Sequence, residues 1–164
     1  MDTETVHATA VVLAAAGVLI RGASGSGKST LALLLLDRAD ALALPGFLVG
    51  DDRIRLARAG DTLLARPHPA LGDGIEVRGL GPCRAIAASG EAPIRLVVDL
   101  AARQPRLPEA AAPARLLGLA LPRLVLDRRH LRSGLAPRLV LDALAEGAGA
   151  PHRGILRMPR ADGP

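Results

Sequence analysis

The sequence predicts an α/β fold: a P-loop domain with a mixed sheet, in which an N-terminal β-hairpin leads into the phosphate-binding loop. Three features indicate this fold. A glycine-rich stretch at residues 22–29 lies between an apolar strand and an apolar helix, a strand-like run precedes it, and residues 54–65 form a second hairpin pattern. Because hairpin strands pair antiparallel, the sheet cannot be purely parallel.

The chain of 164 residues is long enough for one domain with its own core. We expect this single domain over residues 1–150. A frayed tail is expected over residues 151–164, which carry glycine and proline. The net charge is +5, and its arginines are spread along the chain rather than clustered.

Composition excludes several classes of protein. Phe47 is the only aromatic residue, so the stacking platform of a single-strand nucleic-acid binder is not expected. The apolar run at residues 8–20 is too short to span a bilayer and lacks the basic start of a signal peptide. Cys83 is the only cysteine, which suits a reducing compartment. We therefore predict a soluble, cytoplasmic protein that binds neither nucleic acid nor membrane.

The first hairpin is expected from strands at residues 5–13 and 18–20, with small residues between them to turn the chain. His7 starts the first strand, where composition alone favours a solvated surface histidine. The second strand ends at the glycine-rich loop. A helix over residues 30–39 follows, and because leucines occupy nearly all its sides we expect burial on more than one of them.

The loop fits the pattern G-x-x-x-x-G-K-[ST], in the strand–loop–helix context that this motif requires. Its glycines let backbone N–H groups turn inward around an anion, and the helix N-terminus adds partial positive charge. Lys28, the only lysine, would reach the β- and γ-phosphates, and the Ser29 hydroxyl would bind Mg²⁺. The predicted nucleotide-binding residues are Gly22, Ala23, Ser24, Gly25, Ser26, Gly27, Lys28, Ser29 and Thr30. The loop alone does not choose among kinases, GTPases and transport ATPases.

Carboxylates follow the next predicted strand, residues 47–50, as Asp51 and Asp52. At this place they could hold Mg²⁺ or accept a proton, and a polar turn is the alternative. Adjacent residues on an extended chain point to opposite sides, so the two carboxylates should have different roles. Asp99, near the end of a strand over residues 94–100, competes with them for Mg²⁺.

The stretch at residues 67–81 is rich in glycine and proline and predicts a loop that can close over a ligand. Glu76 and Arg78 would share one side, so that one could meet a metal and the other a phosphate. An ordinary surface loop with an ion pair is the alternative. Beyond it we expect a connection with weak helical content over 103–113, one or two short strands over 116–126, a charged turn over 127–132 and a helix over 137–146.

Four stretches in this order resemble the catalytic domain of HPr kinase/phosphorylase: Val6-His7, the loop at 22–29, Asp51-Asp52 and Glu-Val-Arg-Gly-Leu-Gly at 76–81. The resemblance covers roughly residues 5–140 and is closest to the short alphaproteobacterial forms, which consist of the kinase domain alone. It implies an ATP- and Mg²⁺-dependent protein-serine kinase of the phosphotransferase system. Its partner would be an HPr-type phosphocarrier, the reverse phosphorolytic reaction is a further expectation, and a homo-oligomer, a hexamer, is implied.

The resemblance also implies roles for single residues. Asp51 matches the residue that takes the serine proton, Lys28 the phosphate-binding lysine, and His7 a histidine near the transferred phosphate. Arg78 lies in the loop tied to both directions of the reaction, and Arg106 is the best match for a further arginine. The predicted catalytic set is therefore Asp51, Lys28, His7, Arg78 and Arg106, and the predicted metal ligands are Ser29, Glu76 and Asp52.

Two other functions fit the same loop. A small-metabolite kinase of the gluconate- or nucleotide-kinase type would use Asp99 and a phosphate-clamping arginine lid, formed by Arg123, Arg128, Arg129, Arg132 and Arg138. Such an enzyme should tolerate Glu76→Ala, which the protein kinase should not. A nucleotide-binding regulator without catalysis would keep the loop and show no turnover.

Overall fold

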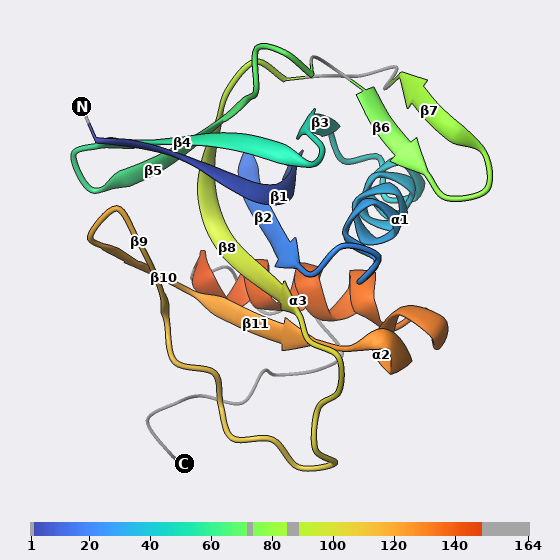
Figure 1. The fold of residues 1–164 in the computed structure, drawn as a ribbon. Helices are drawn as coiled ribbons and strands as arrows, with labels where there is room; N and C mark the ends of the chain where they lie inside the picture. The colour runs from blue at the N-terminus through green and yellow to red at the C-terminus, as the bar shows by residue number, and fades with distance from the viewer. Residues whose placement is uncertain (1, 72–73, 85–88, 149–164) are drawn as a thin grey trace.

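The computed structural model describes residues 2–71, 74–84 and 89–148. The tail expected over 151–164 lies outside the described residues. Strands β1 to β5 span Thr3–Leu13, Ala16–Gly22, Gly46–Gly50, Arg53–Ala59 and Thr62–Pro67. Strands β6 to β11 span Gly74–Val77, Gly81–Arg84, Ala92–Leu100, Ala114–Leu116, Leu119–Leu121 and Arg123–Leu126. The helices are α1 (Lys28–Ala41), α2 (Arg128–Arg132) and α3 (Ala136–Gly147), and Figure 1 shows their arrangement.

The main sheet has seven strands and is mixed, as predicted. Its strand order is β11-β8-β2-β1-β4-β5, and β3 also pairs with β1. Strands β2, β8 and β11 are parallel, whereas β1 is antiparallel to β2, β3 and β4. The length of β1 explains this branching, because its second half pairs with β2 and β3 while its first half pairs with β4. Since β5 pairs with β8 as well, the sheet curls back on itself (Figure 1).

Both predicted hairpins are confirmed. Between β1 and β2 the chain turns through Ala14 and Ala15, which both adopt positive φ angles of 47° and 73°. Two successive positive φ angles give a two-residue turn the twist that matches its strands. Between β4 and β5 the turn lies at Gly60, with φ 60°. The second strand of the first hairpin, β2, therefore leads directly into the glycine-rich loop.

The core forms on both faces of the sheet, because successive residues of β2 point to opposite sides. Val18 and Ile20 pack with α1 and α3, and Leu19 packs in the second cluster, which β4, β5, β9 and β10 enclose. All three of these residues are fully buried. Burial on both faces fixes β2, and with it the start of the phosphate loop.

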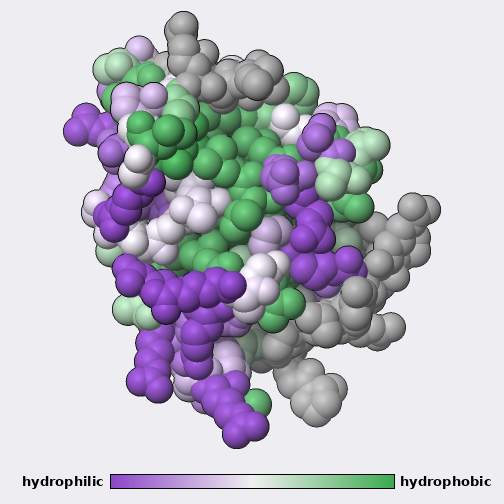
Figure 2. Space-filling model, turned by 90° about the vertical axis from the view of Figure 1, so that its right-hand side faces the viewer, coloured by the Kyte–Doolittle hydropathy of each residue, from purple (hydrophilic) through white to green (hydrophobic). Residues whose placement is uncertain are grey.

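Helix α1 buries one stripe, formed by Leu31, Ala32, Leu35 and Ala39, so the expectation that it is buried on more than one side is wrong. Leu33, on another side, is 37% exposed. Leucines occur on nearly all sides of the helix, so its sequence could not indicate which sides the neighbouring elements would cover. Figure 2 shows hydrophobic residues at the surface on the side where α1 and the β6–β7 hairpin lie in Figure 1.

Three further expectations need correction. Residues 74–84 form the β6–β7 hairpin rather than a loop, with Gly79 at φ 84° in its turn. The connection over 103–113 contains no helix, and three short strands rather than one or two occupy residues 114–126. The charged turn at 127–132 is the short helix α2. The helix expected over 137–146 is confirmed as α3. No helix within the described ranges has the length and apolar character needed to cross a bilayer.

Candidate active site at the phosphate loop

A cavity of about 270 Å³ lies at the glycine-rich loop. Its walls come from β1, the loop, the start of α1, the end of β3 and the β6–β7 hairpin. The lining residues are His7, Ser24, Gly25, Gly27, Lys28, Ser29, Thr30, Asp51, Asp52, Glu76 and Arg78. The structure thus brings together the predicted metal ligands and all but one of the predicted catalytic residues, from stretches between positions 7 and 78 of the sequence.

The loop has the shape of a cradle that side chains would fill. Gly25 and Gly27 have φ angles of 73° and 106°, in the left-handed region that favours glycine. A Cβ at Gly25 would lie 2.9 Å from the Arg78 guanidinium, and one at Gly27 would lie 2.8 Å from Leu131. Gly27 is also the N-cap of α1 and makes no side-chain capping bond, which leaves first-turn N–H groups for an anion. These features fit a bound phosphate chain.

Lys28, the only lysine of the chain, places its ammonium group inside this cradle. Its Nζ donates hydrogen bonds to the carbonyl oxygens of Gly22 at 3.0 Å and Ala23 at 3.2 Å. The residue is 7% exposed, and burial lowers the pKa of its ammonium, an effect that the Asp51 and Asp52 carboxylates oppose. A phosphate group entering the cradle would supply the anion that a desolvated cation needs.

Asp51 joins the loop to two other parts of the molecule. Its carboxylate accepts hydrogen bonds from the Ser29 hydroxyl at 2.9 and 3.0 Å and from the Thr9 hydroxyl at 2.5 Å. The backbone N–H of Glu76 donates a further bond to it at 3.1 Å. Asp51 is 8% exposed, and its carboxylate oxygens are hydrogen-bonded to groups from β1, α1 and β6.

Asp52 has different surroundings from Asp51, although the chain is not extended at Asp52 as the sequence prediction of different roles assumed. Its φ angle of 67° departs from an extended conformation and turns its side chain outward. That side chain is 62% exposed, and its Oδ1 lies 3.1 Å from Nε2 of His7. The exposed pair of Asp52 and His7 forms one wall of the cavity, whereas Asp51 forms its floor.

The β6–β7 hairpin supplies Glu76 and Arg78 to the cavity wall. Both side chains are exposed, and no ion pair joins them within the described ranges, so the ion pair of the surface-loop alternative does not form. No group of three or more His, Cys, Asp or Glu side chains in the described part of the chain is placed to hold a metal ion. Oxygen ligands for Mg²⁺ are nonetheless present in the Ser29 hydroxyl and the carboxylates, and a loop-bound phosphate would complete such a set.

Helix α2 lies against the other side of the loop. Arg128 donates a hydrogen bond from its guanidinium to the Gly25 carbonyl oxygen at 3.2 Å, and Leu131 packs against Gly27. Together with Arg78, Arg128 therefore flanks the tip of the loop. The sequence analysis placed Arg128 only in the arginine lid of an alternative function. The signal it missed is the spacing of Asp127 and His130, which matches a helix N-terminal capping box.

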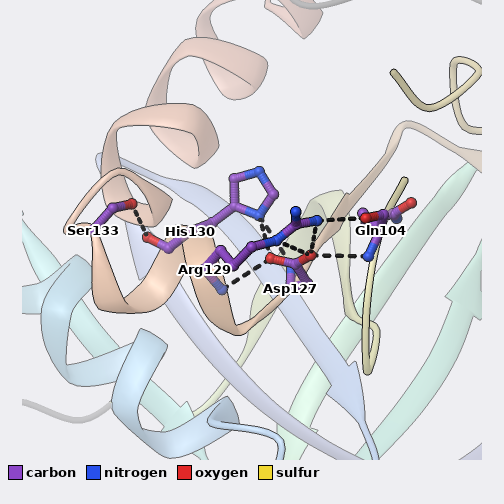
Figure 3. A network of polar contacts seen from close by, with 5 residues as sticks. All are labelled: Gln104, Asp127, Arg129, His130 and Ser133. Carbon is purple, nitrogen blue, oxygen red and sulfur yellow. Dashed lines mark hydrogen bonds and ion pairs between the residues drawn. The ribbon is translucent and has the colours of Figure 1, made fainter. Parts of the chain in front are cut away.

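A network around Asp127 fixes this helix (Figure 3). Asp127 is 1% exposed and accepts hydrogen bonds from the Arg129 backbone and guanidinium and from the Gln104 backbone N–H. The His130 Nδ1 accepts the Asp127 N–H at 3.1 Å. The bond from Arg129 holds the pKa of the Asp127 carboxyl far below its usual range. The network ties α2 to the connection at residue 104.

Two predicted site residues lie away from the cavity. Arg106 lines a separate cavity of about 360 Å³, together with Gln104 and Arg129. Asp99 binds Arg21 through two hydrogen bonds of 2.7 and 2.8 Å and Arg123 through one of 2.6 Å. Although burial opposes the change, these bonds lower the pKa of Asp99. Asp99 is therefore committed to arginines and does not line the phosphate-loop cavity.

Known proteins match this chain over most of its length. The family model described as "HPr Serine kinase C-terminal domain" matches residues 1–126. An HPr kinase/phosphorylase from Azoarcus sp. is 36% identical over 152 residues, which cover 85% of this chain and 46% of that protein. One from Mycoplasma mycoides is 37% identical over 100 residues, 57% of this chain and 30% of that protein. The chain thus spans less than half the length of these curated relatives.

A solved structure matches the fold as well. The Hpr(Ser) kinase/phosphatase from Coxiella burnetii superposes with a TM-score of 0.67 and 25% sequence identity. The match covers 84% of this chain and 97% of that chain. The α/β fold with a mixed sheet is therefore shared with a solved relative.

Proposed function

Because this chain belongs to the family of HPr serine kinase C-terminal domains, we propose that it is a protein-serine kinase that uses ATP and Mg²⁺ to phosphorylate an HPr-type phosphocarrier of the phosphotransferase system. The reaction would take place in the cytoplasm. The observation that carries the proposal is the contact of Asp51 with Ser29 and with the backbone of Glu76, which unites the loop, the acidic doublet and the β6–β7 hairpin.

The nucleotide would bind with its phosphates in the cradle. Lys28 and the first-turn N–H groups of α1 would hold the β- and γ-phosphates, while residues 22–30 form the surrounding loop. When bound, Mg²⁺ neutralises the charge that develops on the transferred phosphoryl group. Ser29 and Glu76 would be its ligands, since both present oxygen atoms to the same cavity.

The geometry supports exchanging the roles first assigned to the two aspartates. Asp51 is buried and accepts the Ser29 hydroxyl, so it would orient Ser29 at the metal rather than meet the substrate. Asp52 is exposed on the cavity wall and would accept the proton of the incoming serine hydroxyl. His7, whose Nε2 lies 3.1 Å from Asp52, would fix the position of this carboxylate.

Arginines from two elements would bind phosphate at the tip of the loop. Arg78 from the β6–β7 turn and Arg128 from α2 lie on either side of Gly25, and no carboxylate pairs with either of them within the described ranges. A guanidinium in this place suits a phosphate oxygen. We therefore assign to Arg128 the role that the sequence analysis gave to Arg106, which lies at a different cavity.

The contacts of the other arginines argue against a small-metabolite kinase. In that enzyme Arg123, Arg129 and Arg138 would belong to a phosphate-clamping lid. Here they are bonded to Asp99, Asp127 and Asp142. A lid made of arginines that already hold carboxylates would have to break those ion pairs to reach a substrate, and this favours the protein kinase.

Association into a homo-oligomer is part of the proposal. Large hydrophobic side chains stay exposed on this chain, among them Leu42 at 54% and Leu80 at 76%. Exposed apolar surface of this kind is a common feature of contact regions between subunits. The number of subunits is left to measurement by light scattering.

The test is incubation of the chain with γ-labelled ATP, Mg²⁺ and an HPr-type phosphocarrier, followed by mapping of the modified residue. We expect label on one serine of the phosphocarrier, and none when Mg²⁺ is chelated. Adding inorganic phosphate afterwards examines the reverse reaction. Nucleotide binding without ATP consumption would instead identify a non-catalytic regulator, and transfer to a small hydroxylated metabolite would identify a metabolite kinase.

A further inference from the structure

The outward face of β4 and β5 carries arginines beside the catalytic cavity. Along β4 the side chains alternate, with Ile54 and Leu56 buried and Arg53 and Arg55 exposed. On β5 the exposed Arg66 lies directly opposite Arg55. We refer to Arg53, Arg55 and Arg66 as the arginine face.

This face begins at the wall of the cavity. Arg53 follows Asp52 in the chain and lies opposite His7 across the β1–β4 pairing, and both of these neighbours line the cavity. At about 3.3 Å per residue along a strand, Arg55 lies about 7 Å further away. The positive charge therefore starts where the substrate serine would enter and extends outward over the sheet.

Most of this charge has no neutralising partner. Arg66 forms an ion pair with Glu91, and Asp52 faces His7. No carboxylate within the described ranges pairs with Arg53 or Arg55. Like charges directly opposite each other on neighbouring strands, such as Arg55 and Arg66, destabilise a sheet. Fold stability therefore does not account for the arginine face.

A protein substrate needs more surface than the cavity offers. A stable protein contact involves about 20–30 residues on each partner, whereas 11 residues line the cavity. The partner must therefore also rest on the surface around the cavity mouth. Arg78 and Arg128 lie at the phosphate loop itself, and the arginine face carries further unpaired charge outside the cavity.

We propose that the arginine face docks an acidic patch on the phosphocarrier, beside the serine that enters the cavity. This inference rests on the proposed function and adds to it how the substrate is selected. Opposite charges that stay partly solvated would mainly raise the rate of association and the affinity for the phosphocarrier, and they would leave the rate of the chemical step unchanged. The interaction is also sensitive to salt, because solvated charges are screened.

The experiment measures phosphorylation kinetics for Arg55→Glu with an HPr-type phosphocarrier at low and high salt. Arg55 lines no part of the cavity. Arg115→Glu is the matched control, since Arg115 is an exposed strand arginine on the separate β9–β10 hairpin. We expect Arg55→Glu to raise the KM for the phosphocarrier about tenfold at low salt, with kcat and the KM for ATP unchanged. The effect should shrink at high salt, and Arg115→Glu should behave like the wild type.

A second variant guards against misfolding: Arg55→Gln should give a smaller increase in the same KM. Equal kinetics for Arg55→Glu and Arg115→Glu, while the wild type phosphorylates the phosphocarrier, would overturn the docking proposal and leave the proposed function intact. A wild type that neither binds nor phosphorylates the phosphocarrier would overturn both. If Arg55→Glu weakened binding to a DNA duplex or to anionic vesicles and left the KM for the phosphocarrier unchanged, the face would serve another partner.

Discussion

Asp51 and Asp127 are both buried carboxylates, but different partners hold them. Asp127 lies against the Arg129 guanidinium, so its charge is neutralised within the chain. The hydrogen-bond donors of Asp51 are uncharged: the hydroxyls of Thr9 and Ser29 and the N–H of Glu76. A carboxylate held by neutral donors keeps its negative charge available to a cation in the adjoining cavity. We therefore propose that Asp51 serves the site, whereas Asp127 stabilises the fold.

The largest effect on phosphoryl transfer is expected from Lys28, whose ammonium group lies in the phosphate-loop cavity. Lys28→Met should lower kcat/KM for phosphoryl transfer about 10³-fold, because it removes a charge that stabilises the transferred group. Its unfolding free energy should stay equal to that of the wild type or rise, since burying an ammonium opposes folding. Steady-state kinetics and urea denaturation measure the two quantities, and a large loss of stability would show that Lys28 supports the fold instead.

Asp127 should show the opposite pattern. Asp127→Ala removes the N-cap of α2 and leaves the Gln104 N–H without its acceptor, so we expect a loss of about 2–3 kcal/mol in unfolding free energy. Urea denaturation measures this loss. Asp142→Ala, which removes an ion pair within α3, is a suitable comparison. A stability equal to the wild type would mean that the network in Figure 3 does not hold α2.

Arg128 connects the Asp127 network with the phosphate loop. It follows Asp127 in the chain, and its guanidinium donates a hydrogen bond to the Gly25 carbonyl oxygen. Arg128→Ala should weaken ATP binding about tenfold, because it removes the guanidinium beside Gly25 that we propose to bind a phosphate oxygen. Arg132→Ala, at the other end of α2, removes the same charge and should bind ATP as the wild type does. Calorimetric titration with ATP distinguishes the variants, and equal affinities for both would remove Arg128 from the site.

The smallest effect is the pH dependence that Asp127 contributes. Its folded-state pKa is depressed, so its stabilisation is fully present above the unfolded-state pKa of about 4 and is lost as the pH falls below that value. Unfolding free energies of the wild type should therefore fall between pH 5 and pH 2.5. Asp127→Asn should show a shallower fall over the same range, and parallel curves would contradict the assigned ion pair.

Local signals were sufficient to predict much of the fold. The β-branched run before the small residues 14–17 predicted the first hairpin, and the loop motif predicted the β2–loop–α1 unit. The two runs at residues 54–57 and 62–65, which flank residues 58–61, predicted the second hairpin. These elements depend on residues close in sequence, which is why pattern alone located them.

Sequence pattern was less informative about the β6–β7 segment and about which side chains meet at the site. Glycine and proline content predicted a loop at residues 67–81, whereas residues 74–84 pair locally as the β6–β7 hairpin. The bond from the Glu76 N–H to Asp51, 25 positions earlier, connects this hairpin to the site. By sequence Arg106 was the best match for the further arginine, and Arg128 was placed only in the lid of the alternative function. The contact of Arg128 with the loop, which supports its proposed role, depends on the packing of α2. The roles of Asp51 and Asp52 likewise depend on which carboxylate the Ser29 hydroxyl reaches.

The division of labour between these two aspartates is tested most directly by measuring Mg²⁺-dependent ATP binding and phosphoryl transfer side by side in Asp51→Asn and Asp52→Asn. We expect Asp51→Asn to weaken Mg²⁺-dependent binding and transfer together. Asp52→Asn should bind Mg²⁺ and ATP as the wild type does while losing transfer at least 10²-fold. The reverse result, with binding weakened only in Asp52→Asn, would contradict the account.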